Sequence, residues 1–197
     1  MAKVRRGLGA ALAVSLGVTV GLLIVQGRWR EAIPLHLCSL SALAALRLAM
    51  GRQPALLDFL WYLGMPGALL ALLFPAPAVS RWQALLDASY YATHTLILIV
   101  PAVCMALGER PRAGRAPAMM IALQGIALAA FAVNLALGTD FLFLMAPPAG
   151  TPLEGVFAAG YGVYLMFLQG MMLALCAAMD ALCARVFYKK AAVADCA

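Results

Sequence analysis

The chain has 197 residues, of which 65% are hydrophobic and 11% charged, and its mean hydropathy is +0.96. Soluble domains carry about a quarter charged residues, so this composition excludes a soluble globular protein. The net charge of +6 would fit a nucleic-acid binder in a soluble chain. Here the cations lie in short connections between apolar runs, so we expect no nucleic-acid partner.

The apolar runs predict one all-α membrane domain over residues 1–197, because about 20 apolar residues are needed for each crossing. All Lys and Arg residues except Arg28, Arg30 and Arg81 fall on one side of such a bundle, which places both termini in the cytoplasm. We expect a multi-pass protein of a bacterial cytoplasmic membrane. The predicted helices are about six in number and cover about 8–25, 33–50, 56–73, 82–107, 117–137 and 156–181.

The first apolar run follows Lys3, Arg5 and Arg6 but has no convincing small-residue cleavage site, so it is interpreted as a retained helix. Within it, Gly17 and Gly21 have the spacing that allows close helix approach. The five cysteines show no CxxC pair, which argues against a redox or zinc site. We expect neither a metal nor a cofactor, and most of the cysteines are interpreted as packing residues.

The stretch Pro34 to Ser39 places a histidine and a thiol near the start of the predicted helix 33–50. At about 100° per residue, Cys38 shares a face with Ser41, Ala42 and Ala45, whose small side chains would let another helix or a lipid chain come close. His36 is two residues from Cys38 and points largely away from it.

The predicted helix 82–107 begins with too many polar residues for a lipid-facing surface, among them Tyr90, Tyr91 and His94. Asn134, Thr139 and Asp140 lie at the end of helix 117–137, where the longest connection, 138–155, begins. In the predicted topology these residues and Cys38 share the outer half of the bundle. By contrast, the charged residues expected near the inner interface are Arg47, Asp58, Asp180 and Arg185.

A thiol becomes a good nucleophile beside a base, and histidine is suited to that role near neutral pH. The candidate catalytic pair is therefore Cys38 with His94. Asp87, about 10 Å from His94 along the helix, cannot orient it directly, so a tyrosine, a water or Asp140 would have to do so. The supporting or substrate-binding candidates are His36, Ser39, Tyr90, Tyr91, Asn134, Thr139 and Asp140.

Other interpretations of the same residues stay open. A lone cysteine in a membrane helix is often a small packing residue, and a lone histidine can bond a neighbouring helix. A haem could be held by His36 and His94 together, but their estimated depths in the membrane are unequal, which argues against such a site. A non-enzymatic lipid-binding or transport protein would use the same polar cavity to recognise a head group, although a transporter is expected to carry polarity to the inner face as well.

Four motifs follow one another along the chain: Pro34-Leu35-His36-Leu37-Cys38-Ser39, Gly64-Met65-Pro66-Gly67, Thr93-His94 and Leu137-Gly138-Thr139-Asp140-Phe141. In this order they resemble the motifs of the YwaF-like integral membrane proteins, a family that includes a vertebrate transmembrane lipid acyltransferase. The resemblance covers about Ile33 to Leu153. The chain departs from the family pattern at Asp140, where Asn is usual, and at Phe74 and Ala76, which replace a more polar turn.

The resemblance implies a cysteine-dependent acyl transfer between phospholipids, with the family cysteine matching Cys38 and the helical histidine matching His94. Membrane lipids would be the substrates. Cys38 would form an acyl thioester and pass the acyl group to a lysolipid or to water, with His94 as base and then acid.

Overall fold

The computed structural model describes residues 2–75 and 82–188, and every regular element in that part of the chain is a helix. Arg81, Lys189 and Lys190, which entered the charge argument, lie outside the described residues, as do Ala76 and Cys196. In chain order the elements are α1 (Ala2–Val25), α2 (Leu37–Met50), α3 (Pro54–Phe59), the π-helix η1 (Leu60–Gly64), α4 (Met65–Leu73), α5 (Gln83–Ala106), α6 (Ala116–Leu137), the 3₁₀ turn η2 (Phe141–Phe143), α7 (Leu153–Ala158), α8 (Tyr161–Cys183) and the π-helix η3 (Ala184–Tyr188).

Five helical segments in the described part of the chain are long and apolar enough to cross a membrane. This confirms a multi-pass membrane protein, and α2, with only 14 residues, is shorter than a usual span. The five segments are Lys3–Val25, Pro54–Leu73, Gln83–Ala106, Ala116–Leu137 and Tyr161–Tyr188.

Two predicted boundaries are wrong for local backbone reasons. The helix predicted over 33–50 begins only at Leu37, because Pro34 disfavours helical geometry in the residue before it and His36 has an extended backbone. The helix predicted over 156–181 is split: α7 ends at Ala158 and α8 starts at Tyr161. Gly160 lies between them with φ of +127°, a conformation that glycine adopts readily.

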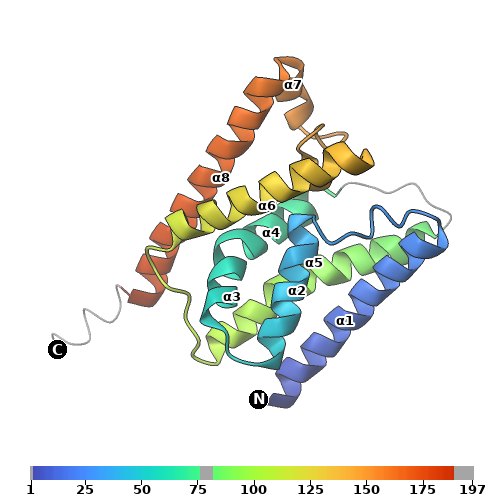
Figure 1. Cartoon of the computed structure of the whole chain (residues 1–197). Coiled ribbons are helices and arrows are strands. Elements are labelled where there is room, and N and C mark those ends of the chain that lie inside the picture. The colour runs from blue at the N-terminus through green and yellow to red at the C-terminus, as the bar shows by residue number, and fades with distance from the viewer. Residues whose placement is uncertain (1, 76–81, 189–197) are drawn as a thin grey trace.

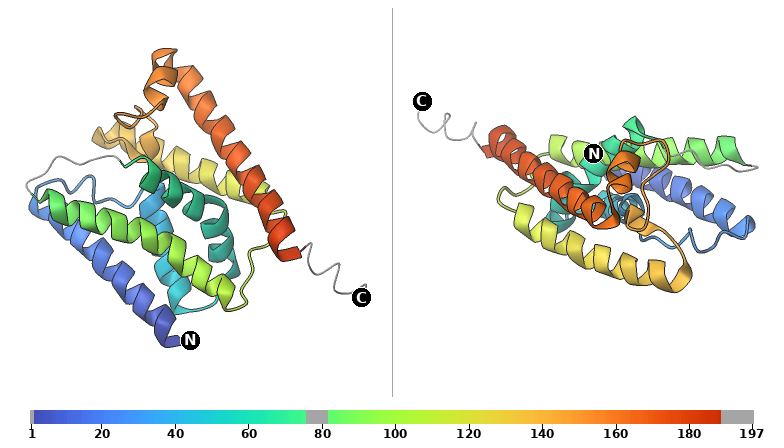
Figure 2. Two further views of the ribbon diagram at one scale, coloured as in Figure 1. Left: turned by 180° about the vertical axis from the view of Figure 1, so that it is seen from behind. Right: turned by 90° about the horizontal axis from the view of Figure 1, so that it is seen from above.

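α1, α2 and α5 form the best-packed part of the molecule, with α3, η1 and α4 beside them and α8 at the opposite flank (Figure 1). α1 and α5 run side by side in both views of Figure 2. Polar contacts join them: Ser15 Oγ donates to the Ser89 carbonyl at 2.9 Å and lies 2.6 Å from Thr93 Oγ1. Such contacts let two helices associate in lipid, where burial of apolar surface provides little driving force.

A glycine other than the predicted pair allows close helix approach in α1. A Cβ at Gly9 would meet the Ala49 Cβ of α2 at 3.1 Å, whereas nothing lies within 4 Å of a Cβ at Gly17 or Gly21. The expectation for Gly17 and Gly21 is therefore wrong. A regular spacing of small residues shows only that a close approach is possible, and the neighbouring helices decide which glycine is used.

The two described ends of the chain meet the same connection, the α5–α6 loop (residues 107–115). Arg5 in α1 pairs with Glu109 of this loop and donates to the Leu48 carbonyl at the end of α2. Tyr188, the last residue of η3, donates to the Pro111 carbonyl at 3.0 Å. The starts of α1 and the ends of α2, α5 and η3 therefore lie at one end of the bundle, so α2 and α5 are parallel and α1 is antiparallel to both.

Candidate functional site

His94 lies in α5 and is only 3% exposed. Its Nδ1 is 2.8 Å from the Tyr90 carbonyl oxygen one turn earlier in the same helix. A carbonyl oxygen can only accept, so Nδ1 carries the proton and donates it. In this tautomer Nε2 keeps its lone pair, which is the form that a general base requires. The orienting group is thus a backbone carbonyl, whereas we had expected a side chain or water.

Tyr90 connects α5 to α4 at this point. Its hydroxyl donates to the Ala71 carbonyl at the end of α4 at 2.6 Å. In a continuing helix that carbonyl would accept from the residue four positions later, but this is Pro75, which has no N–H. The Tyr90 ring also lies 4.2 Å from the His94 ring between centroids. Tyr90 therefore fixes the position of His94 relative to α4.

Cys38 is the second residue of α2 and is half-buried against the core formed by α1, α2 and α5. α2 packs against α5 in this core, and Ser39 follows Cys38 in the chain. Cys38 and His94 therefore lie in two helices that pack against each other. Because α2 begins at Leu37, the thiol is nearer the helix start than the predicted helix had placed it.

Ser41, one turn after Cys38, has a buried hydroxyl for which the described residues provide no hydrogen-bond partner. It packs against η1, where a Cβ at Gly64 would come within 3.1 Å of the Ser41 oxygen. Single π-helical turns occur often at functional sites. Sequence reasoning placed Ser41 on the face of Cys38 but did not reveal this unpaired donor.

His36 precedes α2 and faces the connection after α6. Its ring meets the Phe141 ring edge-on at a centroid distance of 5.1 Å and the Phe143 ring at 5.7 Å. Burial lowers the pKa of His36 below its usual value, and the charges of Asp140 and Glu31 oppose this shift. The His36 ring is thus a packing partner of the connection.

Asn134 holds that connection in place from inside α6. Its amide nitrogen donates to the Phe141 carbonyl at 3.0 Å, and its oxygen accepts from the Phe141 N–H at 2.7 Å and from Thr139 Oγ1 at 3.0 Å. Asn134 is 2% exposed and Phe141 1%. Of the predicted supporting residues, Asn134 and Thr139 therefore build the turn over His36.

The turn continues in an unusual backbone conformation. Leu142 and Phe143 have φ values of +61° and +54°, which residues with a side chain rarely adopt. Asp140 Oδ1 accepts from the Met145 N–H at 2.9 Å, and Tyr164 of α8 donates to the Phe143 carbonyl at 2.6 Å. Strained residues persist only where their surroundings fix them, and they often lie at functional sites.

Tyr91 lies at the periphery of the site. Its side chain is 47% exposed, and its ring meets the Tyr90 ring at right angles with 5.5 Å between centroids. It therefore presents an aromatic face toward the surroundings of the bundle, next to the residue that fixes His94.

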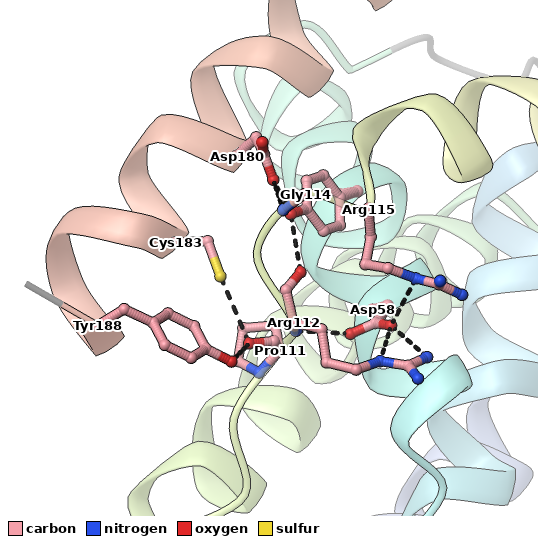
Figure 3. A network of polar contacts seen from close by, with 9 residues as sticks. Asp58, Pro111, Arg112, Gly114, Arg115, Asp180, Cys183 and Tyr188 are labelled. Carbon is pink, nitrogen blue, oxygen red and sulfur yellow. Dashed lines mark hydrogen bonds and ion pairs between the residues drawn. The ribbon is translucent and has the colours of Figure 1, made fainter.

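A second polar cluster surrounds the α5–α6 loop at the other end of the bundle (Figure 3). The carboxylate of Asp58, which is fully buried, accepts from the Arg112 N–H at 2.8 Å and from its guanidinium Nε at 2.7 Å. Asp180 of α8 accepts from Tyr62 and, at 2.7 Å, from the Gly114 N–H. The cluster binds α8 and the loop to α3 and η1, and no spacing in the sequence indicated these pairings.

The fold defines a multi-pass α-helical membrane protein in which α5 carries a buried histidine, His94, and α2 a half-buried thiol, Cys38. Residues 2–180 match the model of the TMEM164 family, and the chain belongs to this family. Neither a curated protein nor a solved structure matches the chain.

Proposed function

We propose that this chain is a membrane-embedded thiol acyltransferase that acts on phospholipid or lysophospholipid acyl chains, as the resemblance to the YwaF-like proteins implies. The observation that carries the proposal is the hydrogen bond from His94 Nδ1 to the Tyr90 carbonyl. It leaves Nε2 as a base in α5, and α2, which carries the Cys38 thiol, packs against α5. A nucleophile, a base and a group that orients the base are the usual requirements for covalent catalysis.

In the proposed reaction His94 Nε2 accepts the Cys38 proton, and the sulfur attacks the ester carbonyl carbon of a lipid. The C–O bond then breaks, the departing lysolipid oxygen takes the proton from His94, and an acyl thioester remains on Cys38. A lysolipid hydroxyl or water next attacks the thioester and gives its proton to His94. The sulfur leaves with the electron pair of the C–S bond and regains the proton.

Transfer of the proton requires Cys38 Sγ and His94 Nε2 to approach within hydrogen-bond reach or to share one water. The supporting residues have distinct proposed roles. Tyr90 is a positioning residue, because it bonds His94 through its carbonyl and α4 through its hydroxyl. The turn from Thr139 to Phe143 and the His36 ring form one wall of the site, and Tyr91 and Ser39 lie at its edge. We place this end of the bundle at the outer side of the membrane, because most basic residues lie at the other end.

The test is transfer of a labelled acyl chain by purified protein in vesicles that contain phosphatidylcholine and a lysophospholipid. Cys38→Ala and His94→Gln should reduce transfer by at least a hundredfold, because each removes a group that takes part in bond making. Cys176→Ala is the matched control, since Cys176 is another buried cysteine and lies in α8. Transfer that survives in Cys38→Ala would exclude the thiol mechanism.

The alternative is a lipid-binding or transport protein that performs no chemistry. An acyl-chain chloroacetamide probe separates the two functions, because only an activated thiol reacts selectively. The acyltransferase should be alkylated at Cys38, with the rate reduced in His94→Gln and unchanged in Cys176→Ala. A binder should show no preference among its four described cysteines beyond that set by exposure.

A further inference from the structure

An apolar groove of about 530 Å³ lies between α2, α3 and α6. This volume is in the range of ordinary ligand clefts. Arg47 is the single charged residue among the described residues that line it. The main apolar lining residues are Leu40, Leu43 and Met50 of α2, Leu56 and Phe59 of α3, and Ile126 of α6.

The groove lies on the face of α2 opposite the candidate thiol. Arg47 is nine residues after Cys38, and at about 100° per residue this places it half a turn away. The burial pattern agrees, because Ala45 and Leu48 are fully buried on the side of α1 and α5, whereas Leu43 and Met50 are 44% and 70% exposed. A ligand in the groove would thus be separated from Cys38 by the helix itself.

Arg47 differs from the paired arginines of this protein. Arg5, Arg28 and Arg112 each have a carboxylate partner. Arg47 is exposed and forms no ion pair or hydrogen bond with the residues that the structure describes. It lies in the last turn of α2, which is the depth at which a long cationic side chain can reach the membrane interface.

The groove and Arg47 together match an amphiphile. From Leu40 to Met50 the groove follows α2 for about 15 Å, and its charged residue lies near one end. A guanidinium binds phosphate oxygens strongly through charge-assisted hydrogen bonds. We infer that this groove binds an anionic glycerophospholipid, with one acyl chain along α2 and the phosphate group at Arg47. The site is independent of the proposed acyl transfer.

The experiment uses the purified full chain, depleted of lipid and then incubated with mixed micelles of phosphatidylglycerol and phosphatidylcholine that carry the same chains. Native mass spectrometry measures the lipid that remains bound. The wild-type protein should retain phosphatidylglycerol in preference to phosphatidylcholine. Arg47→Gln should lower phosphatidylglycerol retention roughly tenfold, the change expected from loss of one charge-assisted hydrogen bond.

Arg6→Gln is the matched control, because Arg6 is an exposed arginine of α1 at the same end of the bundle and does not line the groove. It should leave retention unchanged, and so should Cys38→Ala, because α2 separates Cys38 from the groove. An equal loss in Arg47→Gln and Arg6→Gln would mean that only overall charge matters, and this would overturn the proposal. Loss of retention in Cys38→Ala would overturn the separate location of the site.

Discussion

Replacing Asn134 by alanine should release the turn that covers His36. The substitution removes three hydrogen bonds, two to the Phe141 backbone and one to Thr139. Because Phe141 is buried, its N–H would be left without a partner, and its carbonyl would keep only the bond from the Leu144 N–H at 3.4 Å. At about 0.6–1 kcal/mol for each bond, the loss amounts to about 2–3 kcal/mol.

The loss should appear first as local opening, because the turn can detach while the helices stay packed. Hydrogen exchange of the Phe141 amide should accelerate roughly 30- to 150-fold, the factor that corresponds to about 2–3 kcal/mol. Asn134→Asp should be intermediate, because a carboxylate still accepts from the Phe141 N–H but cannot donate to its carbonyl.

Gln124→Ala is the control in the same helix, because Gln124 forms its amide pair with Gln169 on an exposed surface. It should leave exchange at Phe141 unchanged. If Asn134→Ala exchanges at the wild-type rate at Phe141, the turn is held by something other than this side chain, and the reasoning is refuted.

Three further predictions concern the neighbouring contacts. Tyr90→Phe should lower the free energy of unfolding by about 1 kcal/mol, because the Ala71 carbonyl loses its donor. This loss should be smaller in a Pro75→Ala background, where residue 75 has an N–H that can bond the carbonyl. Equal losses in thermal melts of both backgrounds would contradict the pairing. Gly64→Ala should lower the melting temperature, because its Cβ would meet Leu60 Cδ2 at 2.8 Å and the Ser41 oxygen at 3.1 Å. Gly125→Ala is the control, since nothing lies within 4 Å of a Cβ at Gly125, and it should keep or raise the melting temperature. Because burial lowers the pKa of His36, the unfolded chain takes up a proton at a higher pH than the folded chain does. The free energy of unfolding should therefore fall as the pH drops below about 6.5. In thermal melts from about pH 8 to about pH 5, His36→Gln should show a weaker dependence on pH than the wild-type protein.

Hydropathy was enough to predict the helical membrane class, because the cost of unpaired backbone in lipid leaves few other solutions. It did not predict where helices break. Gly160 separates α7 from α8 and Pro34 delays the start of α2 through backbone geometry, although the surrounding residues remain apolar. The predicted helix 33–50 was therefore longer than α2.

For the candidate site, the sequence pointed to Cys38, His94 and the residues after Asn134 as polar groups in apolar surroundings. What it could not supply was the partner of each group. The acceptor for His94 is a backbone carbonyl, and the partners of Asn134 are mainly the backbone of Phe141. Backbone groups are present at every position, so only the fold decides which of them a side chain meets. The same holds for Asp58, whose partner Arg112 is 54 positions away.

α6 and α8 are bonded to the rest of the molecule at both ends of the bundle. At one end Asp180 bonds Tyr62 and Gly114, and at the other the turn after α6 packs on His36. The groove beside Ile126 lies between these two sets of contacts, on the flank of the bundle formed by α2, α3 and α6. A lipid that diffuses laterally from the bilayer could therefore enter or leave while both sets of contacts stay intact. Exchange of a bound lipid would then need no rearrangement of the bundle.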